Sequence, residues 1–174
     1  MTVTDGAAPA AVPGLRRRLA AFVYEGVLLF GVLMLAALAY GLATQQRHAL
    51  VGMHGLQLFI FLVLGLYFTW FWTHGGQTVA MKTWHVRLVA KDGQPVGVAR
   101  AWLRYALSWL WFVPALVGVY LAGLRRGGAI TLVLLAGVLL YALLARLNPR
   151  RQFLHDLISR TELVYWPAVK RNAQ

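Results

Sequence analysis

The sequence predicts an all-α membrane protein with four transmembrane helices arranged as two hairpins. Of its 174 residues, 60% are hydrophobic and only 13% are charged, whereas soluble domains average about 45–50% apolar and about 25% charged residues. Four apolar segments have lengths suited to a bilayer core of about 30 Å. Most basic residues flank these segments on one side, as the positive-inside rule requires. Together these observations exclude an ordinary soluble domain.

The first expected span covers residues 19–43 and is the most informative of the four. It follows Arg16–Arg18 and contains a single carboxylate, that of Glu25. A charged group inside a bilayer costs roughly 2.5–3.5 kcal/mol on insertion scales, so it generally marks a function or a buried partner. Arg18 lies two helical turns before Glu25 and therefore on the same face of the helix. We expect Glu25 to face the other helices.

The other three spans are expected over residues 56–73, 105–124 and 127–146. The second has no charged residue and ends in an aromatic cluster, which is typical of the headgroup region of a membrane. The third contains Pro114, where we expect a kink. The fourth should stop at Asn148–Pro149, because proline disfavours a helical conformation in the residue before it.

The spans define the domain organisation. Residues 1–14 consist mostly of Ala, Pro, Gly and Thr, a composition that cannot bury an apolar core, and we expect a disordered tail there. Residues 15–164 form one transmembrane domain. Residues 165–174 follow it as a cytoplasmic tail.

The segment between the second and third spans has a different pattern. Apolar and polar residues alternate over Thr83–Ala90, which is typical of a half-buried strand. Lys91–Pro95 is a turn signal, and Val96–Val98 can return as a second strand. We therefore expect a small β-hairpin at the cytoplasmic membrane interface.

The basic residues predict the orientation. With four spans both termini lie on one side, and fourteen of the seventeen Lys and Arg lie there too, against Arg47, Arg125 and Arg126 on the other side. The positive-inside rule makes the terminal side cytoplasmic. The net charge of +12 then reflects contact with the lipid bilayer and its anionic head groups, and we expect no binding of nucleic acid.

Four charged residues are expected near the cytoplasmic end of the spans: Arg18, Glu25, Arg104 and Asp156. Such a cluster can bind a cation or relay a proton, or it can be a set of neutralising pairs that fixes the register of the helices. The sequence leaves both readings open. For Glu25 we expect a polar contact from another element, with Arg104 as first choice and residues 150–156 as second, because the head of Arg18 is drawn toward the interface.

Signals of catalysis are absent from the sequence. There is no G-x-S-x-G, H-E-x-x-H or P-loop motif, and the chain has no cysteine for a thiolate metal site. We expect no enzymatic activity, no cofactor and no bound metal.

Several short motifs occur in order around the expected spans. They are an arginine that enters the first span with an acid seven residues later, a G-Q-T-x-x-x-K segment, an arginine before the third span, and a closing H-D-L-x-x-x-T segment. Their residues are Arg18, Glu25, Gly76, Gln77, Thr78, Lys82, Arg104, His155, Asp156 and Thr161. In this order they resemble the RDD family of bacterial membrane proteins, named for one arginine and two aspartates, from about residue 16 to residue 164.

The resemblance implies a bacterial inner-membrane protein in which Arg18 is the family arginine, Glu25 replaces the first aspartate and Asp156 is the second. Ala80 and Arg160 stand where the family has glycine. Some members are implicated in cation/proton exchange, which suggests transport of cations or protons with Glu25 as the intramembrane carboxylate, favouring a homo-oligomer. The alternative is a non-transporting membrane subunit or scaffold that recruits a partner through its hairpin and C-terminal tail.

Overall fold

The computed structural model describes residues 11–45, 53–147 and 152–167. Four apolar helical segments of this part are long enough to cross a membrane, as predicted. They are α1 (Leu15–Thr44), α2 (Met53–Thr73), the segment Val98–Leu121, and α6 (Gly127–Leu144). Residues 1–10 and 168–174, which hold most of the expected tails, and the expected helix stop at Asn148–Pro149 lie outside the described residues.

The third segment is broken into three pieces. It consists of α4 (Val98–Ser108), a 3-10 turn η1 (Trp109–Trp111) and α5 (Val113–Leu121). It begins seven residues before the expected span at 105, because the polar start of α4 is helical as well. The expected kink occurs at η1, immediately before Pro114, which lies in the first turn of α5. Proline is tolerated there because the first turn has no internal acceptor for its missing N–H.

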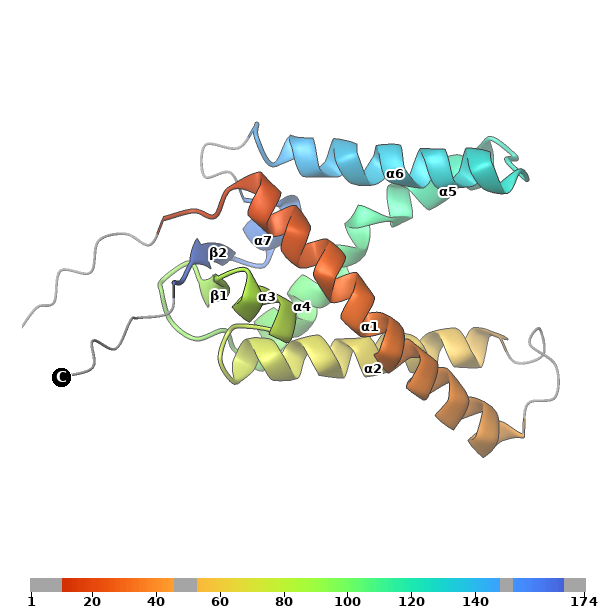
Figure 1. Ribbon diagram of the computed structural model, residues 1–174, viewed down its shortest axis with the longest axis horizontal. Coiled ribbons are helices and arrows are strands. Elements are labelled where there is room, and N and C mark those ends of the chain that lie inside the picture. Colours follow the sequence, from red (N-terminus) through yellow and green to blue (C-terminus); the bar gives the residue numbers. More distant parts are fainter. Residues whose placement is uncertain (1–10, 46–52, 148–151, 168–174) are drawn as a thin grey trace, which may run out of the picture.

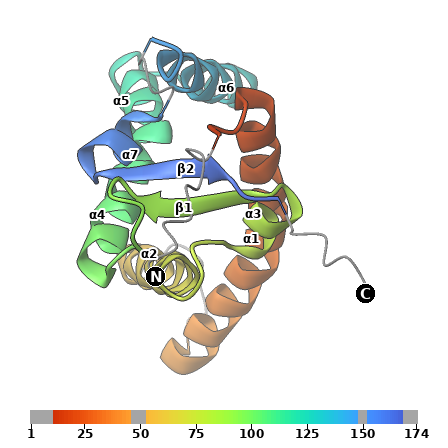
Figure 2. The same ribbon diagram turned by 90° about the vertical axis from the view of Figure 1, so that its left-hand side faces the viewer.

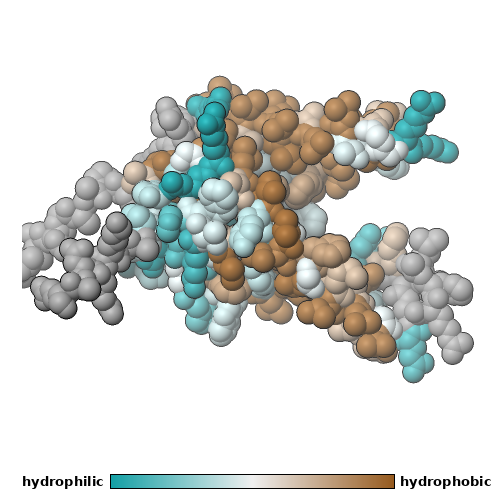
Figure 3. Space-filling model, in the orientation of Figure 1, coloured by the Kyte–Doolittle hydropathy of each residue, from teal (hydrophilic) through white to brown (hydrophobic). Residues whose placement is uncertain are grey.

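The helices form two diverging pairs. α1 packs against α2, and α5 packs against α6, and the pairs spread apart on the side away from the small sheet (Figure 1). Their outer surfaces are apolar (Figure 3), with Leu35 of α1 70% exposed and Tyr120 of α5 84% exposed. Apolar surface of this extent is stable only in a lipid environment. The protein is therefore a polytopic membrane protein.

The expected β-hairpin is wrong in its second strand. β1 (Val86–Ala90) pairs antiparallel with β2 (Thr161–Tyr165), with Leu88 opposite Leu163. The turn after β1 does form, with the Ala90 N–H donating to the Gln94 carbonyl at 2.9 Å. However, the chain then enters α4 at Val98 instead of returning along β1. The strand that pairs with β1 is therefore supplied by the C-terminal segment and not by the residues after the turn.

Two short helices precede the strands and complete the sheet end of the molecule. They are α3 (Val79–Thr83) before β1 and α7 (Leu154–Ile158) before β2, and they lie at opposite ends of the sheet (Figure 2). Val86 and Leu88 of β1 are buried as expected, whereas Trp84, expected on the same face, is 38% exposed. The core lies between the sheet and the nearest turns of the long helices. Its larger members are Trp72, Met81, Tyr105, Trp111, Tyr141, Phe153 and Leu163.

Candidate functional site

Glu25 is buried in α1 and held by two hydroxyl groups. The Tyr67 hydroxyl of α2 donates to Oε1 at 2.7 Å, and the Thr78 hydroxyl donates to Oε2. A polar contact from another element is thus confirmed. The first choice of partner was wrong, because Arg104 pairs with Asp156 and neutral Tyr67 and Thr78 contact Glu25 instead. Residues 150–151 of the second choice lie outside the described residues. Neutral partners leave the charge of the carboxylate uncompensated by these two contacts.

The orientation of Thr78 follows from its place at the start of α3. As the N-cap residue its oxygen accepts the Met81 N–H at 3.2 Å. A hydroxyl has only one proton, and here that proton is directed at Glu25. The cap therefore fixes Thr78 as a donor to the carboxylate.

The two residues before Thr78 attach this cap to the sheet. The Gly76 carbonyl accepts from the Leu88 N–H at 2.7 Å, and the Gln77 side chain donates to the Val86 carbonyl at 2.8 Å. Gly76 has φ +72°, and a Cβ there would collide with the Leu88 carbonyl, so only glycine fits. The G-Q-T motif is thus explained as the support of the Glu25 contact.

Arg104 and Asp156 form a buried ion pair between α4 and α7. Arg104 Nε lies 2.8 Å from Asp156 Oδ1, and the two side chains are 7% and 0% exposed. The Arg104 guanidinium also lies over the Trp72 ring, 4.2 Å from its centroid. The Thr161 hydroxyl contacts Asp156 Oδ1 at 3.4 Å, which gives this motif threonine a role beside the carboxylate.

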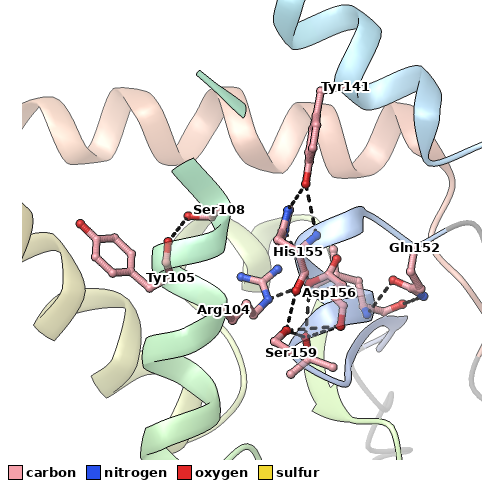
Figure 4. A network of polar contacts seen from close by, with 10 residues as sticks. Arg104, Tyr105, Ser108, Tyr141, Gln152, His155, Asp156 and Ser159 are labelled. Carbon is pink, nitrogen blue, oxygen red and sulfur yellow. Dashed lines mark hydrogen bonds and ion pairs between the residues drawn. The ribbon is translucent and has the colours of Figure 1, made fainter. Parts of the chain in front are cut away.

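His155 lies next to the ion pair and is buried as well (Figure 4). Its Nδ1 is 2.8 Å from the Tyr141 hydroxyl, which also accepts the His155 backbone N–H at 3.2 Å. The phenol proton is therefore free to be donated to Nδ1, which places the ring proton on Nε2, 3.6 Å from Asp156 Oδ1. Burial, assisted by the charges of Arg104 and Arg18 and opposed by that of Asp156, lowers the pKa of His155 to about 4. The imidazole is neutral at neutral pH.

Arg18 lies at the same end of the site. Its guanidinium is over the Phe153 ring, 4.8 Å from the centroid, and its charge contributes to the lowered pKa of His155. The expected four-residue cluster is thus divided. Arg104 pairs with Asp156, Glu25 contacts hydroxyl groups, and Arg18 stacks on an aromatic ring.

Some of these residues, among them Arg18, Glu25, Arg104 and His155, line a cavity of about 460 Å³. The volume lies in the range of about 300–1,000 Å³ that is usual for small-molecule sites. The cavity is bounded by α1, α2, α4, η1 and residues of the sheet end, and its wall is mostly apolar. Its charged and polar lining residues include Arg18, Glu25, Arg104, Ser108 and His155.

Sequence reasoning missed three members of this site: Tyr67, Trp72 and Tyr141. The first two belong to the aromatic cluster at the end of α2, which is also the pattern of a lipid-facing belt. Tyr141 lies in an otherwise apolar run. A hydroxyl inside a span needs a partner, and that requirement was the available signal for Tyr67 and Tyr141.

The chain was compared with protein-family models, curated proteins and solved structures. The model of the RDD family matches residues 12–160. No curated protein and no solved structure matches the chain. The family match covers most of the sequence and includes the motifs that build the Glu25 and Asp156 contacts. The chain therefore belongs to the RDD family.

Proposed function

We propose that this membrane protein moves protons or small cations across the bilayer, with Glu25 as the group that binds them. The observation that carries the proposal is the position of Glu25: the side chain lines the central cavity and is held by the hydroxyls of Tyr67 and Thr78. A carboxylate inside a membrane that is held by neutral hydroxyl groups favours uptake of a positive charge. A carboxylate neutralised by Arg104 would instead support a structural role.

Protons are the better supported cargo. Hard metal cations such as Ca²⁺ or Mg²⁺ take six or more oxygen ligands, whereas both oxygens of Glu25 already accept hydrogen bonds. Within the described residues, no three His, Asp or Glu side chains lie close enough together to hold a metal ion. A proton needs only one oxygen.

The proposal includes a location and an assembly. The distribution of Lys and Arg supports a bacterial inner membrane with both termini in the cytoplasm, next to anionic head groups. Because four helices make a narrow pathway, we propose a homo-oligomer. We propose no enzymatic activity and no nucleic-acid partner. The scaffold alternative has less support, since β1, part of the hairpin that was expected to recruit a partner, already pairs with β2.

The test is proton flux in proteoliposomes under an imposed pH gradient. Glu25→Gln keeps the shape of the side chain and removes its titration, so we expect flux to fall to the level of empty liposomes. Glu25→Asp should retain part of the flux. Asp92→Asn is the matched control, because Asp92 lies in the exposed turn after β1 and should transport like wild type. Full flux in folded Glu25→Gln would contradict the proposal.

A further inference from the structure

Two donors beside the cavity have hydrogen-bonding capacity that the described residues leave unused: the Trp72 indole N–H and the guanidinium of Arg104. Trp72 lines the cavity, and its indole N–H is buried without a hydrogen-bond partner among the described residues. Arg104 donates to Asp156 through Nε (Figure 4), and its two terminal nitrogens form no hydrogen bond with the described residues. Glu25, the carboxylate that lines the cavity, already takes hydrogen bonds from Tyr67 and Thr78. Asp156 Oδ2 is a buried acceptor without a partner among the described residues, but Asp156 is not part of the cavity lining. The missing component is therefore an acceptor-rich group.

The two donors belong to the same end of the cavity. The Arg104 guanidinium stacks on the Trp72 ring at 4.2 Å, so the indole N–H and the guanidinium are adjacent. A guanidinium has five N–H donors in a planar fork that fits carboxylate and phosphate oxygens. A buried donor left without an acceptor costs stability, and an anionic group would remove that cost for both residues.

The remaining wall suits an apolar chain. It is built from side chains of α1, α2, η1 and the residue after η1, with almost no polar surface. An apolar cavity left empty destabilises its surroundings, because its lining lacks contact partners. The aromatic members are Phe22, Phe68, Trp109, Trp111 and Phe112.

We propose that the cavity binds an anionic amphiphile. Its carboxylate or phosphate oxygens accept from Arg104 and Trp72, and its apolar chain lies along the aromatic wall. The chemistry is shared by a free fatty acid and by an anionic membrane lipid. This site goes beyond the proton-binding role of Glu25 and does not depend on it.

Binding can be measured by quenching of tryptophan fluorescence, because Trp72, Trp109 and Trp111 line the cavity. The protein in a neutral maltoside detergent is titrated with brominated oleate and with the brominated alcohol of the same chain length. We expect a saturable component for the carboxylate and at least tenfold weaker binding of the alcohol, since a hydrogen bond to a charged group is lost. Equal binding of the two would overturn the proposal.

Two variants test the polar end. Arg104→Lys keeps a positive charge beside Asp156 but loses the planar fork, and we expect about tenfold weaker binding of oleate. Trp72→Phe keeps an aromatic ring and removes the N–H, and should weaken binding severalfold. Because Trp72→Phe also removes a fluorescent reporter, the affinity of this variant is measured by native mass spectrometry, with unlabelled oleate as the competitor. Wild-type affinity in both folded variants would overturn the proposal.

A matched pair of variants tests the location. Gly26 of α1 lines the cavity, and a Cβ there meets open space, so Gly26→Leu should fill the cavity and abolish the saturable quenching. Gly31 lies on the same helix, also has open space at its Cβ and is not part of the lining, so Gly31→Leu should bind like wild type. Equal binding by the two variants would place the ligand elsewhere and overturn the proposal.

Competition identifies the source of the ligand. Displacement of brominated oleate by phosphatidic acid supports an anionic membrane lipid as the occupant, and displacement by oleate alone supports a free fatty acid. Inorganic phosphate and acetate lack a chain and should not compete at millimolar concentration. Competition by these ions at the strength of the amphiphiles would show a simple anion site and overturn the proposal.

Discussion

Two helix–turn–strand units lie at the sheet end: the first consists of α3 and β1, and the second of α7 and β2. They share a backbone plan, but the first contacts a buried acid and the second a buried arginine. In each, a five-residue helix is followed by one cap residue, one residue with φ +53° and a five-residue strand. The residues with positive φ are His85 in the first unit and Arg160 in the second. The first unit contacts the acid of α1, and the second contacts the arginine of α4. One scaffold thus serves two kinds of charge.

Hydrogen bonds between the units are reciprocal. The Trp166 N–H donates to the His85 carbonyl at 2.8 Å, and the Lys91 N–H donates to the Arg160 carbonyl at 3.0 Å. A glutamine precedes each helix and binds a strand carbonyl of its own unit: Gln77 that of Val86 at 2.8 Å, and Gln152 that of Leu163 at 3.2 Å. The units are therefore related by an approximate two-fold axis through the sheet.

The difference lies in how each unit satisfies its buried charge. In the first unit the contact is a neutral hydroxyl, that of Thr78, and Tyr67 supplies a second one. In the second unit Asp156 meets Arg104 as a full ion pair. An ion pair resists separation because each charge would be left alone in an apolar site, whereas a carboxylate held by hydroxyls can still change its protonation. The second unit is therefore suited to hold the helices together, and the first is suited to a change in the protonation of Glu25.

The largest expected loss of stability comes from a variant that breaks the ion pair of the second unit. Asp156→Ala leaves Arg104 buried without its carboxylate, and we expect a loss of about 3–5 kcal/mol in the free energy of unfolding. Denaturant unfolding in detergent measures it. The double variant Arg104→Leu, Asp156→Leu removes both charges and should recover most of the loss. An Asp156→Ala variant as stable as wild type would show that the pair does not hold the helices.

The next effect is a pH dependence that originates in the second unit. The pKa of His155 is about 4 in the folded protein, against about 6.5 in an unfolded chain. Between these values the unfolded state binds the proton more strongly, so stability falls as pH decreases from about 6.5 to about 4, by up to about 3 kcal/mol. Unfolding measured across this interval tests the expectation.

His155→Gln is the control for this pH dependence. Glutamine can keep a polar contact with Tyr141 and does not titrate, so the decline between pH 6.5 and 4 should be flatter than in wild type. An unchanged decline would show that the pH dependence does not originate in His155.

Breaking the Glu25 contact of the first unit should lower the free energy of unfolding by less than breaking the ion pair of the second. Thr78→Val removes the hydroxyl that caps α3 and donates to Glu25, while the Tyr67 contact remains. Loss of a cap costs about 0.5–2 kcal/mol, and we expect about 2 kcal/mol in total because the acceptor is a carboxylate. Thr78→Ser keeps the hydroxyl and should remain close to wild type. A loss as large as that of Asp156→Ala would remove the distinction between the units.

The parts of the fold that depend on local composition could be predicted from the sequence. The four spans follow from apolar length, and β1 follows from alternation. The partner of β1 could not be predicted, because pairing depends on chain topology and the turn signal at Lys91–Pro95 favoured the nearest segment. The units share a backbone plan with little sequence in common, so the repeat was invisible as well.

From the residues alone the site was predictable only where charge carries the signal, whereas the resemblance to a family also named the neutral residue Thr78. Arg18, Glu25, Arg104 and Asp156 are conspicuous in an apolar sequence, and all four are buried in the structure. Their pairing depends on which helix faces lie together. Neutral partners such as Tyr67 carry no charge to match with an acid, so an arginine was the natural but wrong choice for Glu25.

The smallest expected change in stability concerns the residue with positive φ that occurs in the turn of each unit. Arg160 has φ +53°, a left-handed conformation that glycine adopts without steric cost and that is usual for glycine just after a helix. Arg160→Gly should raise the free energy of unfolding by about 0.5–1 kcal/mol, since relief of strain exceeds the added freedom of the unfolded chain.

His85 has the same φ, but its ring also meets Tyr165 edge to face at 6.4 Å. His85→Gly should therefore gain less than Arg160→Gly, because an aromatic contact is lost with the strain. Arg160→Ala separates the causes: it removes the same side chain and keeps the left-handed strain, so it should not stabilise. If Arg160→Ala and Arg160→Gly unfold at the same denaturant concentration, the backbone conformation has no part in the difference between the two turns.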